Sequence, residues 1–254
     1  MLDRLTAHGS TALIQLPNVE NAGSLADLAN QWSDPSRVTE HDVERYRLSV
    51  EAVANSPLYA DTAVKTVAVV LDADDGSPRN DVYQVKDPDR LVLGLGGSDV
   101  LRGREGHDLL DGGAGSDVLN GAGGDDVLSG GKGRDQLTGG SGDDRFDYNA
   151  PGDSKPGATL RDVISDFVGV GAAAGDRIDL STIDANTTKA GNQAFVFKGA
   201  AAFSGAGQVH VLASGANTLV QANTDANKAT AEMEILVKDG ATTPGHWVAG
   251  DFIL

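Results

Sequence analysis

The feature that most constrains the fold is a nine-residue repeat that runs without a break from residue 94 to residue 147. Its six units are GLGGSDVLR, GREGHDLLD, GGAGSDVLN, GAGGDDVLS, GGKGRDQLT and GGSGDDRFD. The first and fourth positions are always Gly, the sixth is always Asp, and the eighth is Leu five times and Phe once. A fixed period of this kind predicts a solenoid in which each unit packs only against its neighbours.

Each unit predicts a tight turn followed by a short strand. The glycines supply backbone angles that other residues avoid, and the Asp closes the turn with a carboxylate. The next three residues form a strand whose alternation places the eighth position on one face. Two units then complete one coil of a flattened parallel β-roll, with a row of turns along each edge. The inward side chains form two stacks, which are Leu101, Leu119 and Leu137, and Leu110, Leu128 and Phe146.

The aspartates of each turn row should repel one another, because like carboxylates stack about 5 Å apart from strand to strand. The two stacks of apolar side chains are too thin to hold the roll together unaided. A hard divalent cation would solve both problems, and calcium takes six to eight oxygen ligands from carboxylates and backbone carbonyls. The candidate ligands are Asp99, Asp108, Asp117, Asp126, Asp135 and Asp144, with the turn glycines Gly94, Gly97, Gly103, Gly106, Gly112, Gly115, Gly121, Gly124, Gly130, Gly133, Gly139 and Gly142.

The repeat resembles the RTX (repeats-in-toxin) nonapeptide GGxGxDxUx, in which U is apolar, over all six units. The resemblance implies a parallel β-roll in which each calcium lies between a turn and the turn two units later. The implied pairs are Asp99 with Asp117, Asp108 with Asp126, Asp117 with Asp135, and Asp126 with Asp144. We therefore expect roughly four ions in the roll, with extras at its ends.

Several units depart from the consensus. The second position is Leu95, Arg104 and Ala122 in three units, and Glu105 adds further bulk to the second turn. We expect the first two units to bind more weakly or to be half-formed. Gln136 and Arg145 replace the apolar seventh residue, which predicts solvent exposure at both positions.

Strand-like runs separated by turn residues follow the repeat, at 176–180, 194–199, 208–212, 218–222 and 232–238, and predict an all-β segment. The segments RDVISDF (161–167), GDRIDLSTID (175–184) and the terminal DFIL (251–254) resemble the C-terminal domain of serralysin-type metalloproteases and RTX lipases. The resemblance implies that a type I secretion apparatus reads the last four residues. We also expect Asp162, Asp166 and Asp176 to cap the roll, with an additional cation or as solvated loop carboxylates.

The N-terminal region has mixed sequence that resembles no family. Capping patterns predict helices from Ser24 to Trp32 and from Thr39 to about Asn55, and residues 63–71 predict a strand. The segments 82–85 and 90–94 are candidates for the first strands of the roll. The predicted division is a mixed α/β segment over 1–85, the roll over 86–150 and a β domain over 151–254.

The composition argues against several classes of partner, metal site and targeting segment. A net charge of −17 argues against nucleic acid and anionic membranes as partners. No cysteine is available for a thiolate metal site, and no apolar run is long enough to span a membrane. The first residues lack the basic start and apolar run of a Sec-type signal peptide.

No motif predicts catalysis. HExxH, which a serralysin-type zinc protease needs, and the GxSxG elbow of a lipase do not occur. We therefore expect a mostly β, secreted calcium-binding protein that folds on calcium after type I export and acts by binding a host or cell-surface partner. Two alternatives stay open: the non-catalytic C-terminal portion of a larger RTX metalloprotease or lipase, and a small enzyme using Asp or Ser within 1–93.

Overall fold

A computed structural model describes residues 11–15, 67–71, 80, 82–84, 91–172, 174–240 and 244–254. Both helices that we predict in the N-terminal region lie outside these residues. Within the described part of the chain the regular secondary structure is β-strand, apart from two short 3₁₀ turns at Pro244–His246 and Ala249–Asp251. The mostly β class predicted from the sequence is confirmed. None of the described helices is long and apolar enough to cross a membrane.

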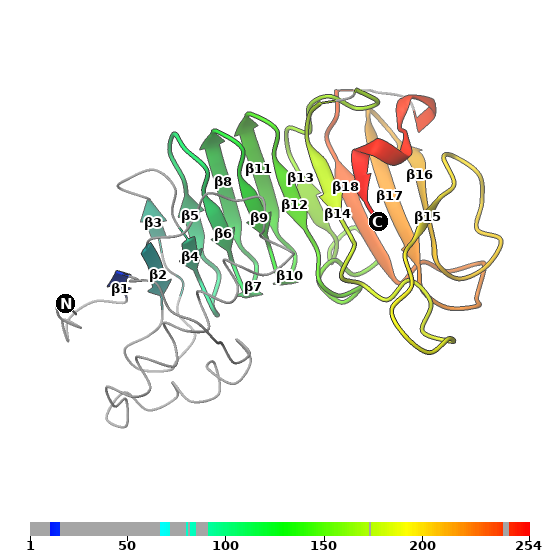
Figure 1. The fold of residues 1–254 in the computed structure, drawn as a ribbon, viewed down its shortest axis with the longest axis horizontal. Coiled ribbons are helices and arrows are strands. Elements are labelled where there is room, and N and C mark those ends of the chain that lie inside the picture. The colour runs from blue at the N-terminus through cyan, green and yellow to red at the C-terminus, as the bar shows by residue number, and fades with distance from the viewer. Residues whose placement is uncertain are drawn as a thin grey trace.

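Two sheets face each other along the length of the molecule (Figure 1). In spatial order, the first sheet contains β1 (Thr11–Gln15), β2 (Val67–Leu71), β4 (Leu91–Leu93), β6 (Leu109–Asp111), β9 (Val127–Ser129), β12 (Arg145–Asp147), β14 (Arg177–Asp179) and β19 (Phe252–Ile253). The second contains β15 (Val196–Phe197), β16 (Gln208–Ser214), β17 (Asn217–Asn223), β18 (Met233–Val237), β13 (Asp162–Ile164), β11 (Gln136–Ser141), β8 (Val118–Gly123), β5 (Val100–Arg102) and β3 (Val82–Gln84).

The repeat forms the parallel β-roll that its period predicts. Successive units alternate between the two sheets, so every strand pairs with the strand of the unit two places later. Leu101 is in register with Leu119, and Leu110 with Leu128, which are offsets of 18 residues. A small parallel pair, β7 (Ala114–Gly115) and β10 (Lys132–Gly133), links two turns along one edge.

The core consists of the two predicted stacks and their extensions. Leu101, Leu119 and Leu137 are fully buried, as are Leu110, Leu128 and Phe146. The stacks join one continuous apolar cluster that runs on through Ile164 and Ile178 into the C-terminal strands. Packing therefore links the roll to the segment that follows it.

The roll begins before the first repeat. β3 pairs in parallel with β5, and β4 with β6, so both predicted starting strands are confirmed. β2 extends the first sheet by pairing in parallel with β4, which confirms a strand over the end of the predicted range 63–71. The sequence did not predict β1, which pairs antiparallel with β2.

The C-terminal segment continues both sheets. β13 pairs in parallel with β11, and β14 with β12, so the roll geometry persists past the last repeat. The second sheet then turns antiparallel through β18, β17 and β16. A strand overlaps each of the five ranges predicted there, with β16 and β17 longer than predicted, whereas β13 was not predicted. The terminal strand β19 pairs with β14.

Candidate metal centre

Two rows of buried aspartates follow the two turn edges of the roll. All six repeat aspartates are no more than 1% exposed. In each row the backbone N–H of one Asp donates to Oδ1 of the Asp two units later: Asp99 to Asp117 (2.7 Å), Asp108 to Asp126 (2.7 Å), Asp117 to Asp135 (2.8 Å), and Asp126 to Asp144 (2.9 Å). The structure thus brings together the four pairs that the resemblance implies.

Each row continues beyond the repeats by one residue from the C-terminal segment. The N–H of Asp135 donates to Oδ1 of Asp162 (2.8 Å), and the N–H of Asp144 donates to Oδ1 of Asp176 (2.9 Å). Both added carboxylates are buried. Asp166 takes a different place, because its two oxygens accept the N–H groups of Gly139 and Gly140 in the last turn (3.0 and 2.9 Å).

The second oxygen of most row carboxylates is buried and has no hydrogen-bond donor. This holds for Oδ2 of Asp117, Asp126, Asp135, Asp144 and Asp162. Burying a carboxylate oxygen without a partner raises the free energy of the fold, so we expect a cation or a proton beside each of these atoms. Asp108 differs, since its Oδ2 accepts the N–H of Arg104 at 3.1 Å.

The first-position glycines allow the Oδ2 atoms to lie close against the backbone. In all six units, a Cβ on this glycine would lie within 3 Å of Oδ2 of the same unit's Asp. At Gly94 it would also lie 2.5 Å from the carbonyl oxygen of Gly112 in the neighbouring turn. A carboxylate oxygen and a carbonyl oxygen therefore meet where a side chain would otherwise be. Carboxylate and carbonyl oxygens are the donors that calcium takes.

The fourth-position glycines are required by backbone geometry. Their φ values lie between 109° and 155°, a region that L side chains rarely adopt. Successive turns also approach so closely that a Cβ on Gly115 would overlap the carbonyl oxygen of Gly97. This approach stacks the turn carbonyls of adjacent coils, which supplies further oxygen donors along each row.

The departures from the consensus have local consequences. Leu95 and Ala122 adopt the positive φ that glycine has elsewhere at the second position, with values of 70° and 82°. A non-glycine residue in this region costs on the order of 1 kcal/mol. The second unit nevertheless forms its strand β6 in full register, so it is not half-formed. Gln136 is exposed as predicted, but the exposure predicted for Arg145 is wrong, because its side chain is only 11% exposed and lies 3.9 Å from Asp179.

The rows are electrostatically unfavourable without a cation. Burial raises the pKa of Asp126 to about 8, and the neighbouring charges of Asp144 and Asp108 add to the effect. Burial also raises the pKa of Asp135 and Asp144 to about 7, and that of Asp162 to about 8. Deprotonated carboxylates are therefore unstable in these rows unless positive charge compensates them.

The donor set is one of carboxylate pairs and backbone oxygens. Among the described residues, no three acidic or histidine side chains converge on a single point. An ion in either row would therefore be bound by carboxylates from adjacent turns together with glycine carbonyls. This is oxygen-only coordination, which suits calcium and not a soft metal.

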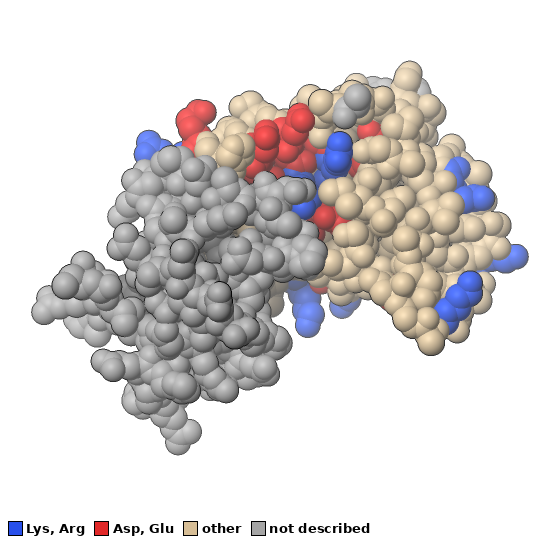
Figure 2. Space-filling model, viewed as in Figure 1, with Lys and Arg blue, Asp and Glu red and all other residues tan. Residues whose placement is uncertain are grey.

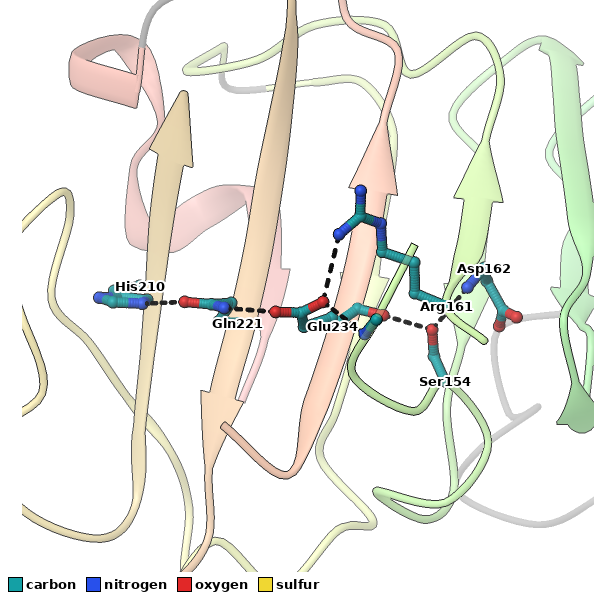
Figure 3. Close-up of polar contacts among 7 residues, drawn as sticks. Ser154, Arg161, Asp162, His210, Gln221 and Glu234 are labelled. Carbon is teal, nitrogen blue, oxygen red and sulfur yellow. Dashed lines mark hydrogen bonds and ion pairs between the residues drawn. The ribbon is translucent and has the colours of Figure 1, made fainter. Parts of the chain in front are cut away.

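A chain of polar contacts joins Asp162 to the antiparallel sheet (Figure 3). The Ser154 hydroxyl donates to the backbone oxygen of Glu234 and accepts the N–H of Asp162 at 2.8 Å. The Glu234 carboxylate accepts from Gln221 (2.6 Å) and Arg161 (3.2 Å), and Gln221 Oε1 lies 2.7 Å from His210 Nε2. The chain crosses β16, β17 and β18 and ends at the last Asp of one row.

Sequence reasoning did not single out Ser154 or Glu234, because neither lies in a repeat. Burial of Glu234 raises its pKa, but hydrogen bonds from the Gly157 N–H, Gln221 and Arg161 outweigh this and lower it below the ordinary value. The carboxylate is therefore ionised and acts as a fixed acceptor. The antiparallel sheet thereby helps to position Asp162.

Comparison with known proteins identifies the repeat. Residues 93–128 and 120–150 match the family model of the RTX calcium-binding nonapeptide repeat. The chain therefore carries RTX calcium-binding repeats. No curated protein matches the chain.

Two of the solved structures that are similar to this chain are solution structures of subunits of mannuronan C5-epimerase from Azotobacter vinelandii. The AlgE6R3 subunit is 28% identical, with 61% of this chain and 77% of that chain covered and a TM-score of 0.43. The AlgE6R2 subunit is 22% identical, with 68% of this chain and 91% of that chain covered and a TM-score of 0.39.

Proposed function

We propose that this is a secreted protein that folds when calcium fills its two aspartate rows after type I export, and that it acts by binding. The observation that supports this proposal most is the set of buried, unpartnered Oδ2 atoms of Asp117, Asp126, Asp135 and Asp144, each beside a first-position glycine. Where calcium is scarce, these carboxylates repel and the roll stays unfolded. Extracellular-type sites bind calcium with Kd of about 10⁻⁴–10⁻³ M, and binding then supplies the free energy of folding.

The proposed ligands are the six repeat aspartates and the turn glycines, with Asp162 and Asp176 closing the two rows. The rows then offer six positions between neighbouring carboxylates, four within the repeats and one at the C-terminal end of each row. The place of Asp166, on the N–H groups of the last turn, favours a capping role for this residue. The division at residues 85 and 150 stays a prediction.

Circular dichroism of the whole chain tests the coupling of folding to calcium. In chelator the spectrum should show a largely disordered roll, and millimolar calcium should restore β structure and raise the melting temperature. Magnesium should substitute poorly, because it demands a tight octahedral shell and gives up its waters reluctantly. Equal spectra and equal melting in chelator and in calcium would refute the proposal.

The alternative function is a calcium-binding and secretion module at the C-terminal end of a larger RTX metalloprotease or lipase. It rests on the resemblance of 151–254 to the domain that follows such repeats. Mass spectrometry of the secreted product from its native source distinguishes the two. A mass matching these 254 residues supports a protein that acts by binding, and a larger product containing them supports the module.

A further inference from the structure

The two turn edges of the roll differ in charge at the third and fifth positions of the repeat units, which lie outside the aspartate rows. Figure 2 shows acidic side chains gathered along the upper edge and basic side chains projecting below the lower edge. The third and fifth positions of the upper turns include Glu105, Asp125 and Asp143. On the lower edge, where β7 and β10 lie in Figure 1, the fifth unit has Lys132 and Arg134 instead.

A groove of about 370 Å³ lies at this lower edge. Its lining includes Lys132, Arg134 and Lys155, the hydroxyl residues Ser116 and Thr159, and the half-exposed Leu160. None of the described residues that line it is acidic. Three cations in one groove are notable in a chain whose net charge is −17.

Backbone pairing brings the three cations together. Gly133 pairs with Gly115 on one side and with Ser154 on the other, both in parallel. The residues that follow, Ser116, Arg134 and Lys155, therefore lie side by side across three neighbouring segments, about 4.8 Å apart at the backbone. Lys132 precedes Arg134 by two residues, and both side chains line the groove.

The three cations are exposed, and none of them forms an ion pair with an acidic side chain of the described part of the chain. Like charges on neighbouring strands destabilise one another. An anion bound between them relieves that repulsion, just as a cation does in the aspartate rows.

We propose that this groove, hereafter the basic groove, binds an oxyanion (a carboxylate or sulfate group) carried by a small or flexible ligand. Guanidinium and ammonium groups donate charge-assisted hydrogen bonds to such oxygens. Ser116 and Thr159 add neutral donors, and Leu160 offers apolar contact to the body of the ligand. The acidic remainder of the surface repels an extended polyanionic surface, so the ligand is compact enough to contact the groove alone.

The test is an NMR titration of the calcium-loaded full chain with sodium sulfate, with a sulfated disaccharide and with its unsulfated counterpart, all at constant ionic strength set by chloride. Sulfate and the sulfated sugar should shift amides at 132–134 and 152–160, and the unsulfated sugar should not. If the sulfated sugar binds more tightly than sulfate, the groove also contacts the sugar ring. If the two bind equally, the groove recognises the oxyanion alone. No shift beyond that of chloride overturns the proposal.

The chain supplies its own matched variant. Lys132→Ala/Arg134→Ser gives the fifth turn the residues that Ala114 and Ser116 hold in the preceding turn, so the backbone should tolerate both changes. We expect at least a tenfold weaker affinity for sulfate. Lys189→Ala/Lys228→Ala removes two exposed charges elsewhere and should leave the affinity unchanged. Equal weakening by both double variants overturns the site. Lys155→Ser, outside the repeats, provides a second measurement if the first variant does not fold.

Discussion

The structure makes Asp126 a link between three turns, and its substitution tests the rows in detail. Asp126 Oδ1 accepts the N–H of Asp108 at 2.7 Å, while its own N–H donates to Oδ1 of Asp144 at 2.9 Å. Its Oδ2 is buried without a partner. If ions lie between successive carboxylates, Asp126 contributes to two of them, whereas Asp99 at the start of the other row contributes to one.

Two substitutions separate charge from hydrogen bonding. Asp126→Asn keeps an oxygen for the Asp108 N–H but removes a charged calcium ligand, so the calcium midpoint of folding should rise by about tenfold or more. Asp126→Ala also leaves the buried Asp108 N–H without an acceptor, which costs about 1–3 kcal/mol beyond the Asn variant. Asp99→Ala should raise the midpoint clearly less than Asp126→Ala does.

The assay is a calcium titration followed by circular dichroism, with urea unfolding at saturating calcium to obtain the free energies. Asp143→Asn is the matched control, because it removes one exposed carboxylate from the same turn edge but outside the row. Its midpoint should stay within about twofold of the wild type, since a solvated surface charge contributes little. A midpoint for Asp126→Asn that equals the control's, or an Asp99→Ala variant as damaging as Asp126→Ala, would refute the shared-ion rows.

Three further outcomes follow from the same geometry. Because burial raises the folded-state pKa of Asp126 and Asp162 to about 8, far above the unfolded value, the calcium-free fold binds more protons than the unfolded chain. The stability of the calcium-free fold should be greatest below about pH 4 and be lost as pH rises toward 8. Circular dichroism in calcium-free buffer should therefore show β structure returning on acidification. An unchanged spectrum between pH 8 and 5 would contradict this. Gly121→Ala places a Cβ against Asp126 Oδ2 and 2.7 Å from the Gly139 carbonyl oxygen. This variant should lower the free energy of unfolding of the calcium-loaded fold by about 1–3 kcal/mol in urea. Gly152→Ala is the control, because its Cβ would have nothing within 4 Å and should not change the stability. Deleting Asp251–Leu254 should reduce export through a matching type I system yet leave calcium binding by the repeats nearly intact, because β19 pairs with β14 and with no repeat strand; undiminished secretion of the truncated chain counts against the secretion signal.

Much of the roll could be predicted because its chemistry is local and repeated. The positions of Gly94 and Asp99 within one unit determine the turn, and the nine-residue period then determines the register of Leu101 on Leu119. The fold class, the stacks and the pairing of aspartates two units apart follow from that period. The continuation of the rows into Asp162 and Asp176 was only partly predictable, since these residues lie 27 and 32 positions beyond their partners.

Other features depend on tertiary contacts that the nine-residue repeat does not determine. Arg145 stands at a seventh position, where its charge predicts solvent exposure, but β14 places Asp179 beside it and reduces that exposure. Ser154 and Glu234 meet although they are 80 residues apart, and neither belongs to a motif. The basic groove arises because Ser154 pairs with Gly133 of the fifth unit and thereby brings Lys155 beside Arg134. Such sites depend on the tertiary arrangement of segments whose separate sequences look ordinary.

The most direct test of the calcium rows is anomalous X-ray diffraction from crystals grown in calcium. The account predicts two lines of peaks, each peak beside the unpartnered Oδ2 of a row aspartate and between neighbouring turns, with the last peaks near Asp162 and Asp176. Rows empty of anomalous signal, with ions only at exposed carboxylates such as Asp125 and Asp143, would contradict it.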